Sequence, residues 1–438
     1  MPRQRTISSC AVRLWGKDVG AVAWDKDRGL ASFQYAPAWV QHGLEIAPLT
    51  MPLDARRIYS FPALNRDTFL GLPGLLADAL PDRFGNTLID VWLAQQGRDK
   101  ADFSPVERLC YMGTRGMGAL EFRPAIGPQA RKALPLEVDE LARIAEQVLK
   151  QRETLNVNLD RDTANALKMI IRVGTSAAGA RAKAVIAWKP ETGEVRSGQV
   201  AMPEGFEPWL LKFDGVNQDF PGDPVGFGRI EYAYYRMATA AGITMTQCRL
   251  FEESGRAHFM TRRFDRTESG EKVHVQSLCA MNHLDFNSPG QHSYEDALSV
   301  IQQLNLGHPA MQELFRRMVF NVLARNQDDH TRNIEFMMGA DGVWSLAPAY
   351  DMTWSHRDDS PWISRHQMRI NGKTDKFEMV DLLAVANRFG IRKAKDIIRQ
   401  INAAVKKWPV FAKDVHVSPN MVETIAATHR LSIVEGEQ

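Results

Sequence analysis

Eight consecutive residues, NQDDHTRN from Asn326 to Asn333, contain two adjacent carboxylates, a histidine and two asparagines. Asp328 and Asn333 are separated by 333 − 328 = 5 positions. Phosphoryl transfer needs a carboxylate that orients a hydroxyl group and accepts its proton, and a neutral oxygen that helps to hold magnesium on the phosphates. One tight loop with this spacing can supply both groups. Asp328 is therefore the candidate catalytic residue, and Asn333 a candidate magnesium ligand.

Other residues occur in the order that phosphoryl transfer requires. The same offset separates Asp from Asn in the protein-kinase catalytic loop H-R-D-x-x-x-x-N, where a second magnesium carboxylate follows a β-hairpin. The run AYDMTW places Asp351 at that point. Lys212 lies in a predicted strand and Glu231 in the next predicted helix, as an ion-paired phosphate-binding lysine requires. Lys212 or Glu231 alone would be more typical of an exposed surface. The prediction therefore rests on all of these residues occurring in this order.

The stretch GTSAAGARAKA could close over phosphate groups through its backbone N–H groups, because glycine and alanine allow a close approach of the main chain. Lys183 or Lys212 would add positive charge. The stretch matches neither G-x-x-x-x-G-K-[ST] nor G-x-G-x-x-G. We expect a strand before it, over the apolar run IIRVG that begins at Ile170, and a second strand after it.

Asp329 and His330 allow a different interpretation of the same cluster. Asp329 is expected to act as a cap or as a second acid, and His330 to brace the loop through hydrogen bonds. A metal-dependent nuclease or phosphohydrolase would use both residues as ligands. That reading needs further histidine or carboxylate ligands, and the nearby WSHRDD text is too irregular for a metal motif.

Composition indicates an ordinary globular protein of two or three domains, with 438 residues of which 44% are hydrophobic. The 54 Lys and Arg residues nearly balance 52 Asp and Glu residues, so contact with nucleic acid would need a local basic patch. The four cysteines are scattered and suggest neither a zinc site nor a disulfide framework. No run has the ~18 apolar residues of a membrane span, and no signal peptide is evident, so we expect a cytoplasmic protein.

Hydrophobic periodicity predicts the elements that would position these residues. Antiparallel hairpins are expected over 10–35, helices over 72–97, and a domain boundary within 123–135. A helix over 311–323 runs directly into the NQDDHTRN cluster. A strand, turn and strand follow over 334–352, and helices return beyond Phe377.

In these motifs the chain resembles the HipA family, the kinase toxins of bacterial toxin–antitoxin pairs. The most specific pieces are SAAGARAKA, RRFDR, FNVLARNQDDHTRN and LAPAYDM, which occur in this order. The resemblance extends over nearly the whole chain. It implies an α+β fold with a kinase-like two-lobed core: a small β-rich N-terminal module (1–130), an ATP-binding part (131–268) and a mostly helical catalytic lobe (269–438).

The resemblance implies a role for individual residues. Asp328 would be the catalytic aspartate, and Asn333 and Asp351 the magnesium ligands. The residues implied to contact ATP are Ala177, Ala178, Gly179, Ala180, Arg181, Lys183, Lys212, Arg262, Phe264 and His330, with Glu231 as the supporting ion-pair partner. Ser176 matches the serine that such kinases autophosphorylate, and Thr175 is the competing acceptor. A phosphate on Ser176 would lie beside the phosphates of ATP, so the modified loop should be expelled and the kinase shut off.

The chain also departs from the family pattern. Ala182 replaces a common proline, and Arg262 stands where some members have Glu. Loss of the proline is expected to leave the phosphate loop less rigid before nucleotide binds. Neither change falls on the catalytic set.

The resemblance implies a serine/threonine protein kinase that arrests growth, and so favours persistence, by phosphorylating a translation component such as an aminoacyl-tRNA synthetase. A small HipB-like helix-turn-helix antitoxin would neutralise it and hold it on operator DNA. Two alternatives remain open. One is an ATP-binding pseudokinase that acts as a corepressor with its antitoxin, and the other is the metal-dependent nuclease or phosphohydrolase.

Overall fold

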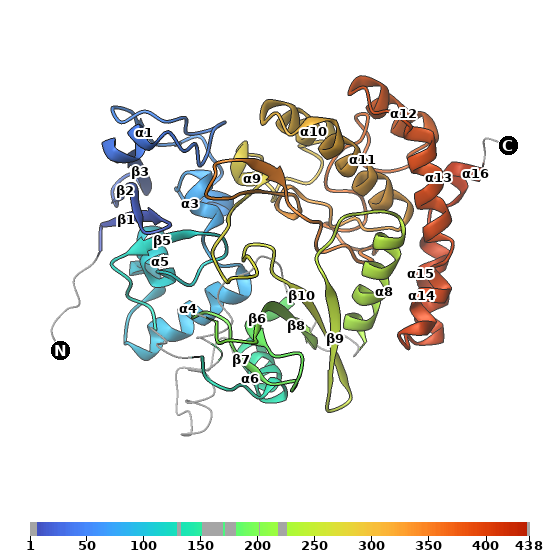
Figure 1. Cartoon of the computed structure of the whole chain (residues 1–438), viewed down its shortest axis with the longest axis horizontal. Helices are drawn as coiled ribbons and strands as arrows, with labels where there is room; N and C mark the ends of the chain where they lie inside the picture. Colours follow the sequence, from blue (N-terminus) through green and yellow to red (C-terminus); the bar gives the residue numbers. More distant parts are fainter. Residues whose placement is uncertain are drawn as a thin grey trace. The chain divides into compact units, whose positions relative to one another are not determined.

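The computed structural model describes residues 7–128, 133–150, 170, 181–200, 202–217 and 226–435. It is a mixed α+β structure, as predicted (Figure 1). The chain divides into two compact units. One comprises Met1–Val225, Phe251–Gln276 and Met338–Gly342, and the other Gly226–Leu250, Ser277–Met337 and Val343–Gln438. These units are cut differently from the three predicted domains, which remain a prediction.

The first unit begins with a five-stranded antiparallel sheet in the order β4-β3-β2-β1-β5. Its strands are β1 (Ser9–Leu14), β2 (Lys17–Asp25), β3 (Leu30–Tyr35), β4 (Ile58–Tyr59) and β5 (Leu120–Arg123). Alternate residues of β1 are buried, namely Cys10, Val12 and Leu14, because successive side chains of a strand point to opposite faces. The hairpins predicted over 10–35 are therefore confirmed.

Helices accompany this sheet along the chain. They are α1 (Pro37–His42), α2 (Arg66–Phe69), α3 (Gly74–Asp78), α4 (Arg83–Gln95) and α5 (Pro105–Met112), with a short 3₁₀ turn at Lys100–Asp102. Asp82 caps α4 by accepting from the Gly85 backbone N–H, and Ser104 with Glu107 forms a reciprocal capping box on α5. Polar side chains thus satisfy free amides that begin both helices.

A second sheet carries the predicted nucleotide-binding strands, in the order β7-β6-β8-β10-β9. It consists of β6 (Arg181–Trp188), β7 (Val195–Ser197), β8 (Glu207–Asn217), β9 (Cys248–Glu253) and β10 (Arg256–Arg262), and α6 (Val138–Lys150) packs on β8. β6 and β8 are antiparallel, with Lys183 opposite Lys212. Residues directly opposite each other share a face of the sheet, so the two candidate lysines lie side by side.

The strand prediction is wrong at the one described residue of its run. Ile170 is helical, and residues 151–169 and 171–180 lie outside the described residues. A short apolar run cannot by itself distinguish a strand from a turn of buried helix, because both bury every residue. The strand expected after the glycine- and alanine-rich stretch is present as β6.

The second unit is mostly helical. Its helices are α8 (Phe227–Ala240), α9 (Leu278–Met281), α10 (Tyr294–Gln303), α11 (Gly307–Leu323), α12 (Met379–Arg388), α13 (Ala394–Val405), α14 (Trp408–Asp414), α15 (Pro419–Thr428) and α16 (Ser432–Glu435). The predicted hairpin is present as β12 (Glu335–Met338) and β13 (Trp344–Leu346), in the sheet order β11-β12-β13 with β11 at His274–Ser277. The helix predicted to run into the NQDDHTRN cluster is α11, which ends at Leu323, shortly before it.

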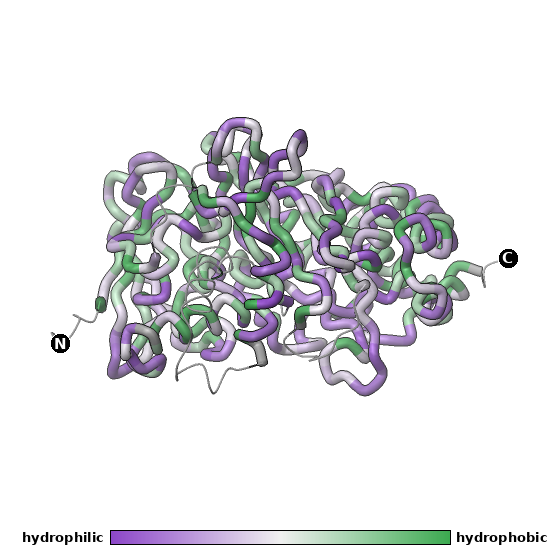
Figure 2. Tube along the Cα trace, turned by 90° about the horizontal axis from the view of Figure 1, so that it is seen from below, coloured by the Kyte–Doolittle hydropathy of each residue, from purple (hydrophilic) through white to green (hydrophobic). Residues whose placement is uncertain are grey.

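The core of this unit fixes α11 firmly. Leu314, Phe315 and Met318 are fully buried, and α11 packs against α10 and α13. The Tyr234 hydroxyl of α8 donates to the carbonyl of Ala324, the residue after α11. Hydrophobic and hydrophilic stretches are interspersed along the trace, as expected for elements that bury one face (Figure 2). Within the described residues, no helix is both long and apolar enough to cross a lipid bilayer.

Candidate active site

The NQDDHTRN loop leaves α11 through a sharp change of backbone direction. Arg325 adopts a positive φ of 56°, which ends the helix. The Asn326 backbone N–H then bonds the Asn321 carbonyl, and the Gln327 N–H bonds the carbonyl of Ser355. Backbone bonds thus fix the start of the loop to α11 and to the segment that follows Asp351.

The two adjacent aspartates of this loop lie in opposite environments. The Asp329 side chain is 1% exposed, and its carboxylate accepts from the Tyr294 hydroxyl at 3.0 Å, His366 Nδ1 at 2.7 Å and the Gln367 backbone N–H at 2.8 Å. The Asp328 side chain is 47% exposed. Of the two predicted roles for Asp329, these contacts support a structural anchor rather than a second acid, and they leave Asp328 as the accessible carboxylate.

A chain of hydrogen bonds connects Asp329 to the segment that carries Asp351. Asn321 Nδ2 donates to the Tyr294 hydroxyl at 2.9 Å, and Asn326 Nδ2 donates to Asn321 Oδ1 at 2.9 Å. Asn326 Nδ2 also lies 3.3 Å from the Asp351 carbonyl. The network therefore joins α10, α11, the loop and Asp351. Sequence analysis did not single out Tyr294, Asn321, His366 or Gln367, because no local motif marks them.

The two candidate magnesium ligands are oxygen donors of the kind that Mg²⁺ prefers. Asn333 Nδ2 donates to the Asp328 carbonyl at 2.8 Å, which leaves its amide oxygen for a cation. Asp351 adopts a positive φ of 52°, and strained backbone of this kind clusters at functional sites. The neighbouring Tyr350 hydroxyl donates to the Arg332 carbonyl at 2.5 Å, so the residues that precede the two ligands are in contact.

Among the described residues, no group of three or more His, Cys, Asp or Glu side chains is arranged to hold a metal ion. His330 instead packs its ring against Phe286, with centroids 5.5 Å apart, and its Nε2 lies 4.0 Å from Asp328 Oδ1. Arg332 covers the same phenylalanine ring at 5.2 Å. These are packing contacts, and His330 Nδ1 is buried without a hydrogen-bond partner among the described residues, so the hydrogen-bonded bracing role expected for His330 stays a prediction.

Both candidate phosphate-binding lysines are buried. Lys183 Nζ lies 3.3 Å from Asp82 Oδ2, and both side chains are almost fully buried. Lys212 has its Nζ 5.5 Å from the centre of the Phe259 ring. Both lysines remain candidates for the phosphate contact. Glu231 is buried in α8 of the second unit, and its pairing with Lys212 remains a prediction.

The predicted phosphate loop falls largely outside the described residues. These undescribed positions are Thr175, Ser176, Ala177, Ala178, Gly179 and Ala180. Arg181 and Lys183 lie within β6. The phosphate-covering and autophosphorylation roles therefore remain predictions.

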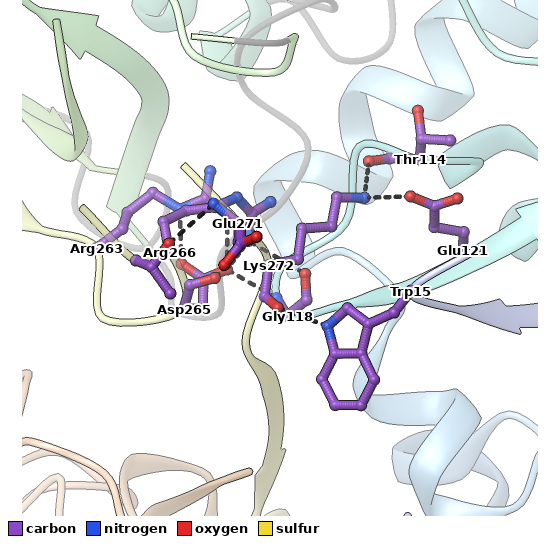
Figure 3. Close-up of polar contacts among 10 residues, drawn as sticks. Trp15, Thr114, Gly118, Glu121, Arg263, Asp265, Arg266, Glu271 and Lys272 are labelled. Atoms are coloured by element: carbon purple, nitrogen blue, oxygen red, sulfur yellow. Dashed lines mark hydrogen bonds and ion pairs between the residues drawn. The ribbon is translucent and has the colours of Figure 1, made fainter. Parts of the chain in front are cut away.

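Three residues of the RRFDR motif, Arg263, Asp265 and Arg266, form a polar cluster on either side of the predicted adenine-contacting Phe264 in the sequence (Figure 3). The Asp265 carboxylate accepts two hydrogen bonds from Arg263, at 2.8 and 2.6 Å, and one from Arg266 at 2.8 Å. The Gly118 backbone N–H donates to the same carboxylate at 2.7 Å. Arg263 and Arg266 thus neutralise the charge of Asp265. Arg262, at the end of β10, pairs instead with Glu207, with its Nη2 3.8 Å from Glu207 Oε1.

The pKa of Asp265 depends on its burial and on its two arginine neighbours. Loss of hydration alone would raise the pKa of Asp265, but the two arginine charges and the hydrogen bonds hold that pKa well below its ordinary value. Lys272 extends the cluster by donating to the Thr114 carbonyl at 2.8 Å and to Glu121 at 2.9 Å (Figure 3). The residues that flank Phe264 are therefore fixed to the N-terminal sheet.

Comparison with known families identifies the chain. A model of the HipA-like C-terminal domain matches residues 175–408, and a model of the HipA N-terminal domain matches residues 10–123. The chain belongs to the HipA family. The candidate catalytic loop, both candidate magnesium ligands and the RRFDR motif lie within the first of these matches.

Two individual proteins are similar to this chain. A Haemophilus influenzae protein described as "Putative kinase" is 30% identical over 173 residues, which cover 34% of this chain and 50% of the relative. The chain thus spans about half the length of that relative. A solved structure of a Shewanella oneidensis toxin–antitoxin system, HipA with HipB and operator DNA, matches with a TM-score of 0.64 and 16% identity. That match covers 97% of this chain and 96% of the other, and it shows a shared fold.

Replacing Asp265 with Asn should destabilise the HipA chain by about 3–5 kcal/mol, because it leaves buried arginine charge without a counter-charge. The folded-state pKa of Asp265 lies below the unfolded value of about 3.9, so the ionised carboxylate stabilises the fold fully above that pH. This contribution is lost as pH falls through the folded-state pKa. The difference between wild type and variant should therefore be largest at neutral pH and shrink below about pH 4.

Denaturant unfolding at several pH values measures this difference. Asp18→Asn is the matched control, because Asp18 forms an exposed ion pair with Arg13 and should contribute less than about 1 kcal/mol. Equal effects of the two substitutions would contradict the role given to Asp265.

Proposed function

We propose that this HipA-family chain is a serine/threonine protein kinase toxin that transfers the γ-phosphate of MgATP to a protein hydroxyl group. The observation that carries the proposal is the paired environment of Asp328 and Asp329. The Asp329 carboxylate is buried and anchors the loop, while that of Asp328, just before it, is accessible and oriented by a single hydrogen bond from Gln367. A solvated surface loop has no need of such an arrangement.

The proposed reaction assigns a task to each of four residues. The acceptor hydroxyl oxygen attacks the γ-phosphorus, the bond from that phosphorus to the β,γ-bridging oxygen breaks, and ADP leaves with the bonding electrons. The hydroxyl proton passes to the Asp328 carboxylate. Asn333 and Asp351 would hold magnesium, which supplies positive charge on the phosphates when bound. Lys212 would contact the phosphates from β8.

Partners and regulation form the finer part of the proposal. The Shewanella HipA relative is in a complex with HipB and operator DNA, which supports a HipB-like helix-turn-helix antitoxin and operator DNA as partners here. We propose a cytoplasmic site of action, a translation component such as an aminoacyl-tRNA synthetase as the protein substrate, and autophosphorylation on Ser176 as the inactivating modification. The kinase name of the Haemophilus relative supports the reaction class.

Asp328→Ala should abolish phosphoryl transfer while leaving ATP binding intact. Loss of a positioned general base reduces the rate by about 10²–10⁴-fold, whereas Asp328 makes no proposed contact with the adenine or phosphate groups. The measurement is transfer of labelled γ-phosphate from MgATP to the purified dephosphorylated chain, with peptide mapping of the label. Label on Ser176 that disappears in the variant is the expected result.

Other outcomes of this assay select the alternatives. ATP binding without any label on wild type would contradict the kinase and favour the pseudokinase corepressor. Cleavage of nucleic acid or phosphoesters without ATP would favour the metal-dependent hydrolase. Label that persists unchanged in Asp328→Ala would remove Asp328 from the mechanism.

Asp351→Asn should raise the Mg²⁺ concentration that gives half-maximal phosphoryl transfer, because a neutral amide binds the cation more weakly than a carboxylate does. We expect an increase of about tenfold or more, since losing one charged ligand of a hard cation costs at least about 1.4 kcal/mol. Asp358→Asn is the control, because its 96% exposed side chain lies in the same segment. An identical Mg²⁺ dependence of both variants and wild type would exclude Asp351 as a ligand.

A further inference from the structure

Gln367 contacts the candidate catalytic carboxylate from a segment that follows Asp351 in the chain. Its Nε2 donates to Asp328 Oδ1 at 3.0 Å, and the Gln367 side chain is buried. Its backbone N–H donates separately to Asp329 Oδ1 at 2.8 Å. One residue therefore contacts both aspartates, the first through its side chain and the second through its backbone.

The hydrogen bond from the Gln367 side-chain amide orients Asp328. Nearly half of the Asp328 side chain is exposed, and a side chain so placed samples several rotamers unless a contact selects one. His330 Nε2 lies 4.0 Å from the same oxygen, beyond hydrogen-bonding distance. Within the described part of the chain, no donor lies on Asp328 Oδ2, so that oxygen stays accessible to an incoming hydroxyl.

The Gln367 amide carries no charge, and this affects how readily Asp328 accepts a proton. A lysine or arginine at this position would stabilise the ionised carboxylate and weaken it as a proton acceptor. A carboxylate would compete for the same proton or repel Asp328. An amide fixes one oxygen by a single hydrogen bond without adding charge, which preserves the basicity of the other oxygen.

The backbone of Gln367 is held independently of its side chain. His366 bonds Asp329 through Nδ1, and its ring packs edge-on against Phe377 with centroids 5.2 Å apart. The Gly290 N–H donates to the Gln367 carbonyl at 2.7 Å. A substitution of the Gln367 side chain therefore removes the contact with Asp328 while the surrounding backbone retains its anchors.

We infer that Gln367 is a positioning residue for Asp328: it holds Oδ1 so that Oδ2 meets the acceptor hydroxyl and takes its proton as that oxygen attacks the γ-phosphorus. This inference rests on the proposed kinase function and deepens it. It also links the segment after Asp351 to the base, because displacement of that segment would release the Asp328 side chain.

Two variants test this role in single-turnover transfer of labelled γ-phosphate from saturating MgATP to the full-length chain. Gln367→Met keeps the length of the side chain but removes the donor, and the transfer rate should fall by about 10–100-fold, the usual cost of a misplaced catalytic group. The Kd for ATP and the thermal midpoint should not change. Gln291→Met is the matched control, because this exposed glutamine of the same unit should tolerate the change without loss of rate.

Gln367→Glu gives a signature that a merely structural role would not produce. At acidic pH the introduced carboxyl group and Asp328 share one proton, and the introduced group, when protonated, can donate the same hydrogen bond to Asp328. The transfer rate should then exceed that of Gln367→Met at acidic pH. It should fall to the Gln367→Met level as pH rises through the upper pKa of the pair, while wild type shows no such fall.

The outcomes separate this inference from the proposed function. A Gln367→Met rate within about twofold of wild type, with transfer abolished in Asp328→Ala, would overturn the positioning role alone. A Gln367→Met loss accompanied by weaker ATP binding or a lower thermal midpoint would assign the residue a general structural role and would also overturn it. Absence of any Asp328-dependent transfer in wild type would reject the kinase proposal and this inference together.

Discussion

The geometry of the candidate active site depends on the buried carboxylate of Asp329. A buried charge is tolerated only when its oxygens are fully hydrogen-bonded. Here the donors are Tyr294 of α10 and the neighbouring residues His366 and Gln367. Removing this carboxylate would leave the Tyr294 hydroxyl, His366 Nδ1 and an amide without their acceptor. The requirement to satisfy all these groups at once fixes the path of the loop.

This constraint places its neighbour Asp328 at the surface with a defined orientation. The loop cannot rotate to bury Asp328 without exposing Asp329, so one carboxylate is structural and the adjacent one is accessible. The polar chain through Asn321 and Asn326 extends the same order to Asp351. The hydrogen bonds of Gln367 and Asn333 to Asp328 fix this residue before any reaction, and a group placed in advance needs little reorganisation.

The RRFDR cluster and the Asp82–Lys183 pair play a corresponding part in the first unit. Both are buried charge arrangements in which residues of the N-terminal module contact residues near the predicted nucleotide site. Such pairs contribute more to specificity of structure than to net stability, because desolvation offsets much of their attraction. The N-terminal module is thus joined to the predicted nucleotide-binding sheet through charge as well as through apolar packing.

Local features of the fold were predictable, and long-range side-chain pairs were not. The helix that precedes the loop follows from its apolar spacing, and the hairpin after Asn333 follows from its turn residues. The offset of Asp328 from Asn333 selects this loop as the candidate site, because phosphoryl transfer requires both groups close together. Gln367 is 39 positions from Asp328, and no periodicity relates a side chain to a partner so far along the chain.

Two features of the first unit also could not be predicted from local sequence: the partner of Lys183 and the conformation at Ile170. Asp82 is far from Lys183 in sequence, so the pairing that occupies this lysine has no local signal. The apolar run at Ile170 suits a strand and a helix equally well, and its conformation depends on neighbours that the pattern does not include. Packing partners, rather than propensity, decide such positions.

Amide hydrogen exchange of wild type and Asp329→Ala tests most directly whether Asp329 organises the active site. If it does, exchange at the Gln367 amide and in the loop over 326–333 should accelerate by about 10–100-fold, because a buried hydrogen bond to a charged group contributes about 1.5–3 kcal/mol. Exchange in β6 and β8 should not change. An unchanged Gln367 amide, or equal acceleration throughout the chain, would contradict the account.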